Sequence, residues 1–72
     1  MESNDLQLIR ESLPPGWRKS ISGVFGVTSK YVSAVLHGRR FNNDILRKAV
    51  EMALAHKKDI QYIREKVSEL YQ

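Results

Sequence analysis

Glycine and proline, the residues that most strongly interrupt helices, occur only between positions 14 and 38 of this 72-residue chain. The sequence PPG occupies positions 14–16, and Gly26 and Gly38 lie further along. Proline removes a backbone amide donor, and glycine adopts the left-handed conformation in which helices commonly end. The chain is therefore divided into short segments of helical length, followed by one long segment after Gly38.

Within these segments the apolar residues recur at intervals of three and four, which is the spacing of one face of a helix. We predict helices over residues 4–13, 17–25, 29–37 and 44–70, and hence an all-α fold of four or five helices. The residues expected to form the buried faces of the first three helices are Leu6, Ile9, Leu13, Trp17, Ile21, Val24, Phe25, Val32, Val35 and Leu36.

The connections between the predicted helices contain residues that are typical of helix ends. A turn of about three residues begins at Gly26, where one helix ends, and Thr28 caps the next helix. Gly38 occupies the corresponding position after the third helix. Asn42 or Asn43 is expected to cap the fourth.

A heptad repeat runs along the last predicted helix. Its apolar or small positions, together with one histidine, are Leu46, Ala49, Ala53, His56, Ile60, Ile63, Val67 and Leu70. We favour one continuous helix over residues 44–70, because neither glycine nor proline interrupts it. The alternative is two helices, with Asp59 capping the second.

The end of this last helix carries four large apolar residues on one face, and they must be buried somewhere. They could fold back on the chain's own core as a fifth helix, or pair with the same residues of a second chain. We expect pairing, because Asp59 and Arg64 flank the heptad at positions where a parallel partner brings opposite charges together. The predicted homodimer interface consists of His56, Ile60, Ile63, Val67 and Leu70.

Composition excludes several classes of site. The chain has no cysteine and two histidines, so disulfides and thiolate metal sites are excluded. A chain of this length has a thin core, and no spacing of Ser, His and Asp indicates a nucleophile with its base. We therefore expect no catalytic site, metal, cofactor or small-molecule effector. The acidic, polar N-terminus differs from a signal peptide, and no segment reaches membrane-spanning length, so we expect a cytoplasmic protein without a membrane partner.

Positive charge is concentrated in the middle of the chain. The net charge is +4, but between Ser12 and Lys48 there are seven basic residues and one acidic residue, Asp44, so seven minus one leaves +6 there. A basic block within a folded segment is typical of a nucleic-acid-binding face. The alternative is an ordinary solvated surface.

Residues 21–38, ISGVFGVTSKYVSAVLHG, have the pattern of a helix, a three-residue turn with glycine, and a second helix. In this arrangement the second helix is held nearly perpendicular to the first and enters the DNA major groove. Residues 17–54 resemble the helix-turn-helix domains of the phage lambda-type repressor and Cro family. VSAVLHG also resembles lactose-repressor headpieces, but the helices before and after the motif favour the first family. Arg18 stands where that pattern often has glutamine, and Ser22 where alanine is usual.

Helical geometry predicts which side chains of the second motif helix face the DNA. On the helix over residues 29–37, Lys30, Ala34 and His37 point away from the buried face. The residues expected to contact bases are Thr28, Ser29, Lys30, Tyr31, Ser33, Ala34 and His37. The residues expected to contact phosphates are Arg18, Lys19, Arg39 and Arg40. For Tyr31, packing against the preceding helix is an equal alternative.

We therefore expect residues 1–56 to form a domain that binds double-stranded DNA, and residues 57–72 to form a helical extension for dimerisation. The expected function is that of a sequence-specific transcriptional regulator, most simply a repressor that acts by occlusion. One alternative is an architectural DNA binder with weak base preference. Another is a protein-interaction module whose basic face is incidental.

Overall fold

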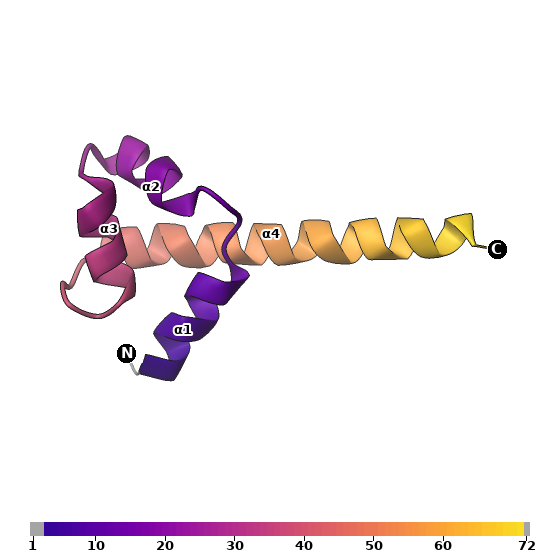
Figure 1. Cartoon of the computed structure of the whole chain (residues 1–72), viewed down its shortest axis with the longest axis horizontal. Helices are drawn as coiled ribbons and strands as arrows, with labels where there is room; N and C mark the ends of the chain where they lie inside the picture. Colours follow the sequence, from indigo (N-terminus) through magenta and orange to yellow (C-terminus); the bar gives the residue numbers. More distant parts are fainter. Residues whose placement is uncertain (1–2, 72) are drawn as a thin grey trace.

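A computed structural model describes residues 3–71 and contains four helices (Figure 1). They are α1 (Ser3–Ser12), α2 (Trp17–Phe25), α3 (Ser29–Leu36) and α4 (Asn43–Leu70), with no strand among the described residues. The prediction of an all-α fold with a long C-terminal helix is confirmed. Because α4 is continuous, the alternative of two helices with Asp59 as a cap is wrong.

The turn between α2 and α3 has the conformation that its residues predict. Gly26 has a φ of 68°, and its amide and that of Val27 both donate hydrogen bonds to the Ser22 carbonyl oxygen. Glycine adopts this left-handed conformation at little cost, so α2 ends there. The Thr28 hydroxyl oxygen accepts a 3.0 Å hydrogen bond from the Tyr31 amide and caps α3.

A Schellman motif ends α3. Gly38 has a φ of 81°, and its amide donates to the Val35 carbonyl oxygen at 3.1 Å. The Arg39 amide donates to the Ala34 carbonyl oxygen at 2.9 Å. These two bonds satisfy carbonyl groups of the last turn and set the direction in which the chain leaves the helix.

Gly38→Ala is expected to destabilise the fold by about 1–2 kcal/mol, the cost of a left-handed conformation with a side chain. An added Cβ would also lie 3.2 Å from Leu6 Cδ1. Gly23→Ala is the matched control, because Gly23 lies within α2 and a Cβ there meets nothing within 4 Å. That control should stabilise by about 0.5–1 kcal/mol. Urea unfolding measures both, and equal midpoints would contradict this role of Gly38.

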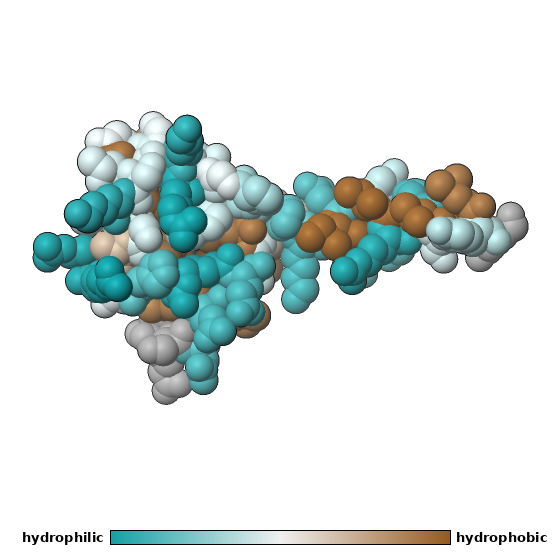
Figure 2. All heavy atoms as spheres, viewed as in Figure 1, coloured by the Kyte–Doolittle hydropathy of each residue, from teal (hydrophilic) through white to brown (hydrophobic). Residues whose placement is uncertain are grey.

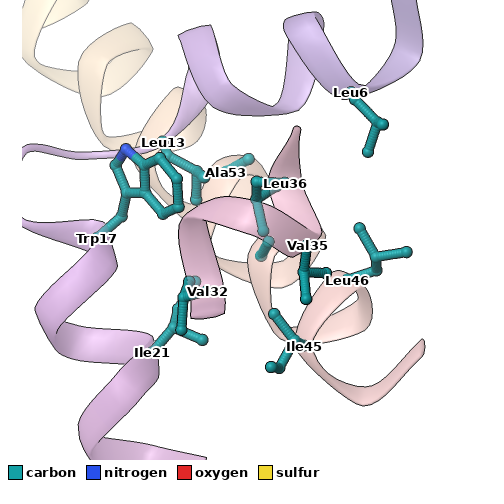
Figure 3. Close-up of a cluster of buried hydrophobic side chains, with 11 residues drawn as sticks. Leu6, Leu13, Trp17, Ile21, Val32, Val35, Leu36, Ile45, Leu46 and Ala53 are labelled. Atoms are coloured by element: carbon teal, nitrogen blue, oxygen red, sulfur yellow. The ribbon is translucent and has the colours of Figure 1, made fainter. Parts of the chain in front are cut away.

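The core forms where α1, α2 and α3 pack on the first half of α4 (Figure 3). Its buried residues are Leu6, Leu13, Trp17, Ile21, Val32, Val35, Leu36, Ile45, Leu46, Ala49 and Ala53. The core residues of α2 are Trp17 and Ile21. Val24 and Phe25 were also predicted to be buried, but their side chains are 62% and 37% exposed, so that prediction is wrong. The reason is that α2 ends one turn beyond Ile21, where Gly26 turns the chain away. Phe25 lies beside charged side chains of α4 instead.

Polar contacts fix α1 against the rest of the domain. Arg10 Nη1 donates to the Leu36 carbonyl oxygen at the C-terminal end of α3, where the helix dipole favours a cation. His56 Nδ1 lies 3.3 Å from the Ser12 carbonyl oxygen at the end of α1. His56 therefore has a hydrogen-bond partner within its own chain, which its heptad position did not predict.

The two ends of α4 have different surroundings. At its beginning, the Asn42 side-chain oxygen accepts a 3.1 Å hydrogen bond from the Ile45 amide, so Asn42 rather than Asn43 is the cap. Up to residue 56 the helix packs on the domain, whereas residues 57–71 are exposed and extend away from it (Figures 1 and 2). Among residues 3–71, no helix combines the length and apolar character that membrane crossing requires.

Candidate nucleic-acid interface

A concavity of about 790 Å³ lies against the exposed side of α3. Its walls come from the beginning of α2, from α3 itself, and from the loop that follows α3. The nine lining residues are Arg18, Thr28, Ser29, Lys30, Tyr31, Ser33, Ala34, Arg39 and Arg40. All nine are among the residues that the sequence predicts to contact bases or phosphates. We call this surface the basic groove.

The lining of the basic groove is positively charged. It includes three arginines and one lysine, and no carboxylate. In the part of the chain that the structure describes, the only ion pair joins Lys66 to Glu69, near the end of α4. A concave surface with charges of one sign attracts oppositely charged ligands and raises their association rate. The basic groove is therefore suited to a polyanion.

The Schellman motif brings Arg39 and Arg40 to the basic groove. Both backbone amides donate to the Ala34 carbonyl oxygen, at 2.9 Å and 3.3 Å. The two residues are thus tied to the last turn of α3, and both of their exposed side chains line the groove. The planar guanidinium group presents paired donors that match phosphate oxygens, so these side chains suit a phosphate backbone.

Arg18 reaches the same groove from the first turn of α2. Its guanidinium carbon lies 4.3 Å from the centroid of the Trp17 ring, a cation–π distance. Trp17 is buried, so the guanidinium group rests on a fixed aromatic surface. Stacking leaves the in-plane N–H groups of Arg18 available for a phosphate.

Hydroxyl groups surround the N-terminal end of α3. Thr28 and Ser29 lie there, where the helix dipole favours negative charge. The Tyr31 ring packs partly against the core, and its hydroxyl oxygen accepts a 3.4 Å hydrogen bond from Asn42 Nδ2. Tyr31 also lines the basic groove, so packing and exposure to a ligand are compatible at this residue.

Two of the predicted DNA contacts lie outside the basic groove. Lys19 and His37 are exposed, but neither lines it. His37 Nδ1 lies 2.8 Å from the Ser33 carbonyl oxygen, one turn back along α3. Nδ1 must carry the proton to donate there, so the neutral ring presents Nε2 as an acceptor. His37 thus lies outside the surface that Lys30 lines.

The loop after α3 contains an exposed aromatic residue that was not predicted to belong to the site. Phe41 is 77% exposed. It lines a smaller concavity of about 210 Å³, which shares Arg39 and Arg40 with the basic groove. The only feature of the sequence that could have indicated Phe41 is that it is a single aromatic residue within the polar run RRFNN.

The C-terminal apolar stripe, defined as Ile60, Ile63, Val67 and Leu70, lies on the extended part of α4 (Figure 2). All four side chains are exposed. The alternative in which this segment folds back as a fifth helix is therefore wrong. The stripe leaves a continuous apolar helix face open to a partner.

Hydrogen-bond donors and positive charges are the functional groups that the basic groove offers. Among residues 3–71, no three His, Cys, Asp or Glu side chains form a group that could hold a metal ion. Comparison of the chain with protein-family models, with curated proteins and with solved structures gives no match.

Proposed function

We propose that this protein is a sequence-specific, double-stranded-DNA-binding transcriptional repressor that places α3 in the major groove. The basic groove carries this proposal, because it surrounds the exposed face of one helix with cations and hydroxyl groups and contains no carboxylate. The major groove admits an α-helix and exposes a distinct pattern of donors and acceptors at each base pair. An operator occupied in this way would be closed to other proteins, so occlusion is the simplest mechanism of repression.

Base selection in this proposal depends mainly on Lys30. This exposed side chain can donate to O6 and N7 of guanine. Ala34 offers a methyl group to thymine, and the Thr28 and Ser29 hydroxyl groups can meet base edges or a phosphate. Because Lys30 offers one cation and Ala34 one methyl group at the centre of the DNA-facing side of α3, we expect moderate sequence preference.

Phosphate contacts come from the arginines of the basic groove. Arg18 lies at the start of α2, whereas Arg39 and Arg40 lie beyond the end of α3. The two sets thus flank α3 along the chain, and we propose that they hold the DNA strands beside it. Such contacts fix the orientation of the protein on the duplex and do not depend on sequence. We place Lys19, outside the groove, in a peripheral phosphate contact.

The proposal includes a parallel homodimer formed by the C-terminal apolar stripe. In a parallel pair, Asp59 of one chain faces Arg64 of the other, twice by symmetry. Two-fold symmetry also suits two copies of α3 that enter successive major grooves, about 34 Å or a multiple of that apart. Because His56 is bonded to Ser12 of its own chain, we place the beginning of the interface at Ile60.

Lys30→Ala is expected to weaken binding to the preferred sequence by about 1–3 kcal/mol and to relax preference at one base-pair position. Arg39→Ala is the contrasting variant, since it should weaken preferred and random sequences alike. His37→Ala should have a smaller effect than Lys30→Ala, because its ring lies outside the basic groove. Selection from random DNA with each variant measures these preferences. An unchanged preference in both Lys30→Ala and His37→Ala would contradict the assignment of α3 as the reading helix.

The same selection separates the proposed function from its alternatives. A sequence-specific regulator enriches one site, usually with two related half-sites when it binds as a dimer. An architectural DNA binder retains DNA without enriching a sequence. A protein-interaction module retains no duplex DNA at physiological salt.

A further inference from the structure

Phe41 is an exposed aromatic residue whose charged neighbours in the concavity that it lines are both arginines. Its ring is 77% exposed. It follows directly after Arg39 and Arg40 and precedes two asparagines. The apolar side chains that line the concavity beside it, including Leu6 and Leu46, are themselves buried in the core. The exposed ring therefore lies between the two arginine side chains and a small apolar concavity.

The loop holds Phe41 in place from both sides. Before it, the Arg40 amide donates to the Ala34 carbonyl oxygen at 3.3 Å. After it, the Asn42 side chain caps α4 at the Ile45 amide and donates to the Tyr31 hydroxyl oxygen. These bonds restrain the backbone on both sides of Phe41, so the loop itself loses little conformational entropy when the ring is buried by a ligand.

We propose that Phe41 packs on the deoxyribose of the DNA strand whose phosphates Arg39 and Arg40 bind. This inference rests on the proposed function. A nucleic-acid strand alternates charged phosphates with sugars whose carbon atoms form an apolar surface, and residues 39–41 present two cations followed by one apolar ring. Arginine and aromatic residues are also common in protein–protein interfaces, but the linings of the basic groove and of the concavity beside Phe41 contain no carboxylate, as a polyanionic ligand requires. The setting of Phe41 therefore favours a sugar–phosphate strand over an apolar protein surface.

The test compares salt dependence rather than affinity alone. Full-length wild type, Phe41→Ala, Phe41→Leu and Arg40→Ala are titrated with a mixed-sequence duplex at several salt concentrations. Phe41→Ala should weaken binding by about tenfold or more at every salt concentration, because ring burial is lost. Its salt slope should equal that of wild type, because an apolar ring releases no counterions. Phe41→Leu should lie between the two, and Arg40→Ala should have a lower slope.

Several outcomes would overturn the inference. Equal affinity of wild type and Phe41→Ala would exclude the sugar contact and leave the proposed function intact. A weaker self-association of Phe41→Ala, measured without DNA, would assign the ring to a protein interface instead. If wild type itself bound no duplex, the proposed function would fail and this inference with it. Because Phe41 is mostly exposed, the variants should keep the wild-type unfolding midpoint.

Discussion

An Ile63→Glu variant is expected to be a folded monomer that binds its DNA site about 10²–10⁴-fold more weakly than wild type, the usual gain from linking two binding units. Ile63 is 57% exposed in the single chain, so a glutamate there is hydrated and leaves the core intact. In a paired stripe, the same substitution would bury two carboxylates without partners, which is strongly unfavourable.

Sedimentation and circular dichroism measure the association state and the helicity of this variant. Gln61→Glu is the matched control, because it introduces the same charge two residues earlier, outside the C-terminal apolar stripe. It should remain dimeric. An Ile63→Glu protein that is still dimeric at micromolar concentration would place the interface elsewhere. A protein that unfolds would show that the exposed half of α4 is needed by the core.

The double variant Arg39→Ala/Arg40→Ala should bind all duplexes more weakly, by on the order of ten-thousandfold or more. In a two-fold dimer it removes four charged hydrogen-bonding groups, each worth about 1.5 kcal/mol or more. The salt slope should change as well. With Arg18, Lys19, Arg39 and Arg40 contacting phosphates in each chain, we expect a slope of about −7 for wild type and about −4 for the variant.

Arg47→Ala/Lys48→Ala is the control for this charge removal. These two residues also belong to the basic segment, but they lie on α4 in a separate concavity with Asp44 and Glu51. The control therefore lowers the net charge equally without changing the basic groove. Equal losses in the two double variants would mean that overall charge, rather than the groove, determines binding.

Local signals explain why much of the fold could be predicted from sequence. The end of α2 at Gly26, the Thr28 cap and the end of α3 near Gly38 each depend on the conformational preference of a single residue. The continuity of α4 follows from the absence of any interrupting residue after Gly38. These preferences act over a few residues, so the sequence alone contains them.

The features that sequence missed depend on packing between elements. Val24 and Phe25 have the spacing of a buried face, but α2 ends one turn beyond Ile21, and there the two side chains stay 62% and 37% exposed. His56 has the spacing of a dimer position, yet its bond to Ser12 depends on where α1 docks. The basic groove depends partly on local spacing and partly on tertiary geometry. Helical spacing predicted the groove residues that α3 contributes. The position of Arg39 and Arg40 beside that helix follows instead from the geometry of the loop after α3.

Duplex DNA binding measured against salt concentration decides whether the basic groove has the proposed role. Wild-type protein should bind a mixed-sequence duplex, and its dissociation constant should rise about ten-thousandfold between about 50 and 200 mM salt, as eight phosphate contacts per dimer require. Binding to the sequence enriched by selection should be tighter at every salt concentration. Absence of binding at low salt, or a dissociation constant that does not change with salt, would contradict a DNA-binding function for this surface.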